Sequence, residues 1–133
     1  MIIKVKPDIK KVSSILDLVK NREDSLLFLD SEKFSTIICE FYYEIIKELS
    51  SALILLDGFK SIGENSHKDL IDFLSNYKEI SEREIILIHD LRVKRNKSSY
   101  EGKEIDGFYL KSHKNSLLEI IKRLKSLINK KIK

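Results

Sequence analysis

The residues between Ser31 and Asp57 constrain the fold most, because apolar side chains recur at helical spacing along this whole segment. The pattern predicts one long helix, and Gly58 directly after it suits the left-handed conformation in which many helices end. The apolar stripe is wide, so several other elements are needed to cover it. It consists of Phe34, Ile37, Ile38, Phe41, Tyr42, Ile45, Ile46, Leu49, Leu53 and Leu56.

Two shorter helices are expected on either side of this segment. The first begins at Pro7, whose backbone geometry suits a first helical position, and runs to about residue 29 or breaks near residues 21–22. The second follows Ser66, which with Asp69 three residues later resembles a capping box. This pair predicts a helix over residues 67–77.

Two more helices are expected in the C-terminal part of the chain. Ser81 and Glu84 form a capping box, which predicts a helix that runs to about Ser99. Residues 85–88 within it, Ile-Ile-Leu-Ile, indicate a buried segment. Ser112 is expected to cap the last helix, whose apolar face is supplied by leucine and isoleucine residues.

Composition and length complete the prediction of the fold. The 133 residues include one proline and four glycines, so few positions interrupt a helix. Residues 105–110 are the only candidate for a strand. We therefore expect an all-α, up-and-down bundle of about five helices that forms a single domain over residues 1–133.

The net charge of +4 is unevenly distributed, with about +7 on residues 111–133 and about −3 on residues 1–110. The last helix is therefore a basic element on a mildly acidic body. One interpretation is a solvated helix face, and the other is a surface for nucleic acid or for an acidic partner.

Several functional classes find no support in the sequence. The single Cys39 cannot form an intrachain disulfide, and the N-terminal residues lack the apolar core of a signal peptide, so a cytoplasmic protein is expected. No apolar run is long enough to span a bilayer. The histidines and the cysteine lack the spacing of a metal site, and there is no glycine-rich phosphate loop, so neither a metal nor a cofactor is expected.

Polar residues form a stripe on the helix that begins near Ser81. His89, Arg92, Asn96 and Ser99 are three or four positions apart and so share one face. Arginine binds phosphate through two hydrogen bonds, and asparagine adds a neutral donor. The stripe is therefore a candidate phosphate site, at which a nearby tyrosine or histidine could transfer a proton.

A structural role for the same stripe is the alternative. An unpaired guanidinium is costly to bury and does not neutralise, so each arginine near the core needs a partner. Arg92 could pair with Glu44 or Glu48 on the long helix, and Asn96 could cap a neighbouring helix end.

A family resemblance begins at Arg95-Asn96-x-x-x-Tyr100, which resembles the Arg-x(4–6)-His motif of HEPN domains, named for higher eukaryotes and prokaryotes nucleotide-binding. Residues 41–58 and 66–71 resemble the second and third helices of that family, and the resemblance covers roughly residues 31–128. It implies a helical bundle that forms a homodimer. In active members, motif Arg and His residues of two protomers cleave RNA without a metal.

The resemblance also implies partners. Many HEPN proteins are toxins encoded beside a minimal nucleotidyltransferase that acts as the antitoxin, and other members are non-catalytic modules that bind RNA or a partner. The possible partners of this chain are thus a second copy, RNA and a minimal nucleotidyltransferase, with no membrane. In a third interpretation, the similarity to HEPN domains reflects only the general pattern of a helical bundle, and the protein functions in protein–protein contact.

Carried over to this sequence, the motif gives Arg95 as the motif arginine and Asn96 as the polar residue after it. Tyr100 stands at the histidine position, where a side-chain pKa of about 10 rather than about 6.5 makes it a poor base. The expected catalytic residues are Arg95, Tyr100 and His89, and the expected RNA phosphate ligands are Arg92, Asn96 and Lys97. A weakened ribonuclease and a non-catalytic module both remain open.

Overall fold

The computed structural model describes residues 1–133 and confirms an all-α bundle of five helices. No helix combines the length and the apolarity that crossing a bilayer requires. A short two-stranded sheet and one turn of 3-10 helix (η1) complete the chain. The helices are α1 (Ile9–Leu26), α2 (Ser35–Leu56), α3 (Ser66–Phe73), α4 (Glu82–Glu101) and α5 (Gly107–Ile132), and η1 covers Leu74–Asn76.

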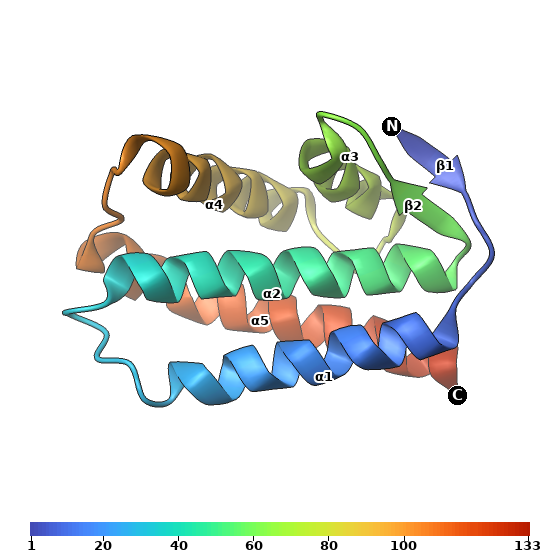
Figure 1. Ribbon diagram of the computed structural model, residues 1–133, viewed down its shortest axis with the longest axis horizontal. Helices are drawn as coiled ribbons and strands as arrows, with labels where there is room; N and C mark the ends of the chain where they lie inside the picture. The colour runs from blue at the N-terminus through green and yellow to red at the C-terminus, as the bar shows by residue number, and fades with distance from the viewer.

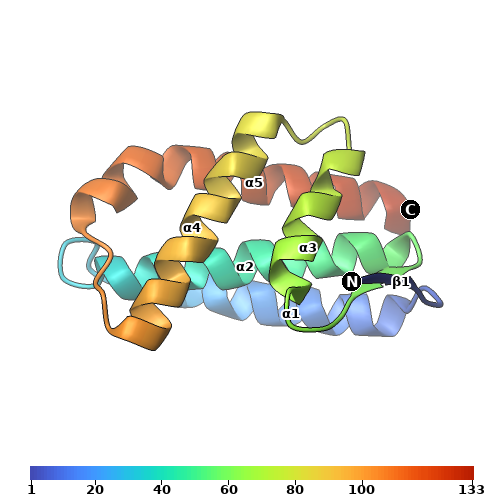
Figure 2. The same ribbon diagram turned by 90° about the horizontal axis from the view of Figure 1, so that it is seen from above.

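The long helix α2 lies at the centre of the molecule. In Figure 1, α1, α2 and α5 run along the long axis, and α3 and α4 lie on one side of this layer. Figure 2 shows that α3 and α4 cross over α2 and α5 rather than run along them. Helix α2 packs most extensively against α5 and α1. Neighbours on several sides explain the wide apolar stripe, in which Leu49 and Leu53 are fully buried.

The sheet was not expected from the sequence. Strand β1 (Ile2–Lys4) pairs antiparallel with β2 (Phe59–Ser61), and Ile3 lies opposite Lys60. Three-residue strands are too short to show the alternation by which a strand is recognised. Residues 105–110, the only candidate for a strand in the sequence, do not form one, because Gly107 already begins α5.

Two helix starts differ from the sequence prediction for the same reason, which is an aspartate that bonds to the backbone. The Asp30 carboxylate accepts hydrogen bonds from the amides of Glu32 and Lys33, so a turn forms there and α2 begins only at Ser35. The Asp106 carboxylate accepts a hydrogen bond from the Tyr109 amide and caps α5. The predicted cap, Ser112, therefore lies inside the helix, six residues after Asp106.

The capping box at Ser66 and Asp69 does not form. The Asp69 carboxylate instead binds the N-terminal ammonium group, and α3 has no side-chain cap. The box at Ser81 and Glu84 is confirmed, with hydrogen bonds of 3.1 and 2.9 Å in the two directions. Helix α4 therefore has a fixed start.

Helix α4 is less buried than its apolar run suggested. Within residues 85–88 only Ile88 is buried, and Ile86 is 62% exposed. The helix contacts the body along one face and ends at Gly102, where a φ of 68° permits the left-handed turn. One face of α4 thus points toward α2 and α3. The polar stripe lies along the edge of that face, where His89, Arg92 and Asn96 are half-buried and Ser99 is exposed.

Candidate functional site

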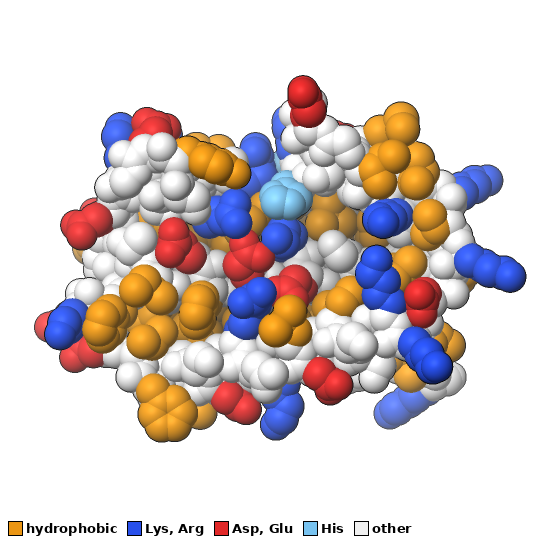
Figure 3. Space-filling model, viewed as in Figure 1, with side chains coloured by type: hydrophobic (Ala, Val, Ile, Leu, Met, Phe, Trp, Pro, Cys, Tyr) orange, Lys and Arg blue, Asp and Glu red, His pale blue; other side chains and the backbone are white.

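The candidate site lies where α3 and α4 face each other above α2. Figure 3 shows a histidine side chain in the notch between α3 and α4, with lysine or arginine side chains and carboxylates around it. The groups that interact there come from three helices: Tyr43 and Glu44 from α2, His67 from α3, and Arg92 and Arg95 from α4.

Arg95 is held by α2. Its Nη2 donates a 2.7 Å hydrogen bond to Glu44 Oε1, and its guanidinium carbon lies 5.4 Å from the centre of the Tyr43 ring. The structural alternative, in which Arg92 pairs with Glu44 or Glu48, is wrong in its choice of partner. Arg95 pairs with Glu44, and Arg22 pairs with Glu48 at 2.7 Å. Arg95 therefore contributes to the packing of α4 on α2 as well as to the charge of the site.

Glu44 is the single carboxylate between two cations, because Lys47 Nζ lies 2.8 Å from its other oxygen. Burial alone would raise the pKa of the Glu44 carboxyl. The hydrogen bond and charge of Lys47, together with the charges of Arg95 and Arg22, outweigh burial and lower this pKa below its ordinary value. Glu44 is thus a firmly ionised counter-ion.

Arg92 is the half-buried arginine that pairs with no carboxylate. Its one side-chain hydrogen bond runs from Nε to His89 Nδ1 at 3.4 Å, which leaves both Nη groups without a protein acceptor. A guanidinium with two free amino groups on one edge presents the fork that matches a phosphate. The other half-buried arginines, Arg22, Arg95 and Arg123, each form an ion pair.

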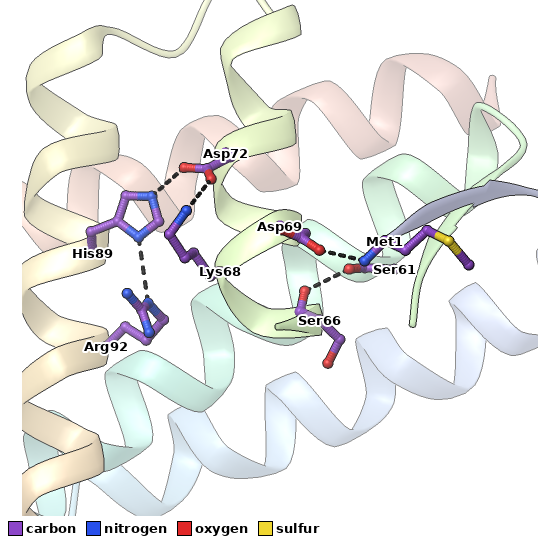
Figure 4. A network of polar contacts seen from close by, with 8 residues as sticks. All are labelled: Met1, Ser61, Ser66, Lys68, Asp69, Asp72, His89 and Arg92. Carbon is purple, nitrogen blue, oxygen red and sulfur yellow. Dashed lines mark hydrogen bonds and ion pairs between the residues drawn. The ribbon is translucent and has the colours of Figure 1, made fainter. Parts of the chain in front are cut away.

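His89 lies between Asp72 and Arg92 and contacts both, as Figure 4 shows. Its Nε2 donates to Asp72 Oδ1 over 2.6 Å, and its Nδ1 accepts from Arg92. Lys68 binds the other oxygen of Asp72 at 3.1 Å. Both ring nitrogens of His89 are engaged, so this histidine must lose a contact before it can accept a proton from a ligand.

Burial would raise the pKa of the Asp72 carboxyl. The hydrogen bonds from Lys68 and His89 outweigh burial and lower it. Asp72 therefore stays ionised and fixes the His89 ring.

The remaining predicted site residues do not gather at one point. Asn96 Oδ1 accepts a 3.4 Å hydrogen bond from Arg95, so Asn96 lies at the edge of the site. Lys97 is exposed, and Tyr100 is 79% exposed near the end of α4. Five positions on a helix correspond to a rotation of about 140°, so Arg95 and Tyr100 face different sides. One chain therefore does not bring the two motif positions together.

Tyr43 was not singled out by the sequence, because it stands in an apolar run and its neighbour Tyr42 fits the core stripe. Its hydroxyl is buried and has no hydrogen-bond partner, which is unusual for a buried polar group. Burial raises the pKa of Tyr43 to about 12, against the opposing charges of Arg95 and Arg92. The hydroxyl is therefore a neutral donor at neutral pH.

His67 lies in the first turn of α3. In the structure its ring lies 6.4 Å from the Tyr43 ring, centre to centre, and makes no hydrogen bond or ion pair. Burial lowers the pKa of His67, and the charges of Lys47, Arg95 and Arg92 lower it further, against the carboxylate of Glu44. His67 is thus a neutral imidazole with free nitrogens among cations.

The lowered pKa of His67 makes stability depend on pH. The ordinary pKa of a histidine is 6.5. Below this pH the unfolded chain takes up a proton at His67 before the folded protein does, so the free energy of unfolding decreases. We expect the stability that depends on a neutral His67 to be fully present above pH 6.5 and to be lost as the pH falls through the pKa of His67 in the folded protein. Urea unfolding at several pH values should show a smaller loss between pH 7 and 5 for His67→Gln than for the wild type. Equal losses in both proteins would contradict the assignment.

The basic C-terminal helix is partly neutralised by the body. Of the eight cationic side chains of residues 111–133, five lie outside any ion pair, and the other three bind carboxylates of other segments. These pairs tie α5 to α4, to α1 and to the end of α2. They are Arg123 with Glu84, Lys125 with Glu23, and Lys131 with Asp57.

No cluster of three or more histidine, cysteine, aspartate or glutamate side chains is placed to hold a metal ion. Comparison with protein-family models, with curated proteins and with solved structures finds no match to this chain. The function must therefore be argued from the site itself.

Proposed function

We propose that this protein is HEPN-like and acts on RNA, and that it holds an RNA phosphate at Arg92 in the notch between α3 and α4. The observation that carries the proposal is the half-buried guanidinium of Arg92, which has no carboxylate and is oriented by His89 and Asp72. Such a group gains two charge-assisted hydrogen bonds when a phosphate arrives. The exposed lysines of α5 add a long-range attraction for a polyanion.

The charges around Arg92 support the binding of an RNA phosphate. Lys47 and Arg95 share the one carboxylate of Glu44, so the surroundings of Arg92 and His67 carry an excess of positive charge. A stretch of RNA brings the negative charge that balances it. The resemblance of residues 95–100 to the HEPN motif favours RNA over other phosphate-bearing ligands.

Binding is tested with a fluorescently labelled single-stranded RNA and anisotropy measurements. Arg92→Ala is expected to weaken binding by about tenfold or more, since hydrogen bonds to a charged group contribute about 1.5–3 kcal/mol. Arg83→Ala is the matched control, because Arg83 is an exposed arginine on the same helix and its loss changes the net charge equally. Equal weakening in both variants would show only a diffuse attraction and would remove Arg92 from the site.

A ribonuclease activity is tested by incubating the protein with end-labelled RNA in the presence of EDTA. If Arg95 acts as the arginine of the HEPN motif, Arg95→Ala should abolish cleavage. Because Arg95 also binds Glu44, circular dichroism must show that the variant is folded before its activity is interpreted.

The second candidate function is a non-catalytic module that dimerises or binds a minimal nucleotidyltransferase. The exposure of Tyr100 favours it, because a hydroxyl at the end of α4 is accessible to a partner protein and far around the helix from Arg95. Failure of the wild-type protein to bind RNA would favour this module over the RNA-directed function.

A further inference from the structure

We propose that His67 is the proton acceptor in cleavage of RNA at this site, and that it removes the proton from a ribose 2′-hydroxyl next to the phosphate held by Arg92. The inference rests on the proposed RNA-directed function and adds to it a reaction and a residue. None of the residues that the sequence suggested for proton transfer has this geometry.

The surroundings of His67 are those of a general base. Its ring is half-buried and makes no hydrogen bond, so neither nitrogen has to be released before it accepts a proton. The Tyr43 ring on α2 lies 6.4 Å from it, centre to centre, and the Arg95 guanidinium lies over that same Tyr43 ring. The charges of Lys47, Arg95, Glu44 and Arg92 also act on the imidazole. The cations keep the imidazole unprotonated near neutral pH, as a base requires.

The same cations stabilise the negative charge that develops on the phosphate in the reaction. The phosphate gains negative charge as a fifth oxygen bonds to phosphorus, and Arg92 is free to donate to it through both Nη groups. The Tyr43 ring packs 6.4 Å from the His67 ring, centre to centre, but its side chain is fully buried, so the donors that a bound phosphate reaches are those of Arg92. The site thus combines a free base with donors that are already fixed in position.

The reaction needs no nucleophile from the protein. The 2′-hydroxyl passes its proton to His67, its oxygen bonds to phosphorus, and the bond from phosphorus to the 5′-oxygen breaks. The departing 5′-oxygen takes a proton from water, and the proton on His67 neutralises the hydroxide left behind. The products are a 2′,3′-cyclic phosphate and a 5′-hydroxyl end, with no net change in protons.

The other candidates for proton transfer are placed less well. His89 uses both ring nitrogens, one on Asp72 and one on Arg92, and therefore acts as a positioning residue for Arg92. Tyr100 is 79% exposed and turned away from Arg95. His67 is the histidine that faces the arginines with its nitrogens free.

The test compares wild type, His67→Ala and the control His113→Ala on end-labelled RNA with EDTA present. His113 is a control because it lies on α5, where its ring packs against Tyr109 rather than against the residues of the site. His67→Ala is expected to lower the cleavage rate by about 100-fold or more, the usual contribution of a general base. Added imidazole should restore part of the rate in His67→Ala, since it can occupy the vacated space. His113→Ala should cleave like the wild type, and all three proteins should bind the RNA similarly.

Two further readouts separate catalysis from a structural effect. The wild-type rate should rise with pH through the pKa of His67, and the remaining activity of His67→Ala should lack this rise. An RNA with a single 2′-deoxyribose at the cleaved position should bind and remain intact.

Two outcomes would overturn the role of His67. Cleavage by His67→Ala at the wild-type rate, or with the wild-type pH dependence, would assign the base to another residue. RNA binding that depends on Arg92, without any cleavage by the wild type, would also overturn it and would leave the proposed RNA-directed function standing.

Discussion

Replacing Leu53 by alanine is expected to lower the free energy of unfolding by about 3 kcal/mol, which is a large share of the stability of a domain of this size. Leu53 is fully buried on α2, the helix that packs against both α1 and α5. Removing its side chain leaves a cavity that rigid helices on several sides cannot fill. Urea denaturation should show a lower midpoint with an unchanged slope.

Leu18→Ala on α1 is the matched control for this substitution. Leu18 is 44% exposed, so the same chemical change removes fewer contacts and leaves no closed cavity. We expect a loss of about 1 kcal/mol or less. Similar losses for both leucines would contradict the central position of α2.

Replacing Glu44 by alanine is expected to cost about 2 kcal/mol, because it leaves Arg95 and Lys47 without their shared carboxylate. The side chains of Glu44 and Arg95 are 18% and 20% exposed, so water compensates only in part. The guanidinium stays charged and has no other acidic partner in the structure. Thermal or urea unfolding at neutral pH measures the loss.

The control for Glu44→Ala is Lys68→Ala, which breaks an exposed pair with Asp72 and should cost under about 0.5 kcal/mol. In a background that already carries Arg95→Ala, the cost of Glu44→Ala should shrink, because the stranded guanidinium is gone. An unchanged cost in that background would mean that Glu44 stabilises the fold by some other contact.

The fold could be predicted from the sequence because it depends on periodic patterns. The apolar stripe of α2 and the capping box at Ser81 and Glu84 are local signals. The capping box forms, and most of the stripe is packed in the core, whereas Ile37 is 41% exposed. The starts of α2 and α5 were missed because Asp30 and Asp106 bond to nearby amides, which depends on backbone geometry rather than on residue spacing. The sheet was missed because its strands are far apart in the chain.

The site could be predicted only where it lies on one helix. Arg92 and Asn96 were found because they share a face of α4, and Arg95 because it stands in the motif at residues 95–100. Tyr43 and His67 come from α2 and α3, and no local pattern relates them to α4. The choice of partner for Glu44 also depends on how α4 is rotated on α2, which spacing alone does not fix.

The packing of α2 against α5 has a consequence for how the protein is made. These helices are the most extensive partners in the core, yet α2 ends at residue 56 and α5 begins at residue 107. During synthesis, α1 and α2 leave the ribosome with the surface that α5 will cover still in contact with water. The apolar residues of α2 that α5 covers therefore stay open to chaperones, or to other nascent chains, until α5 has emerged.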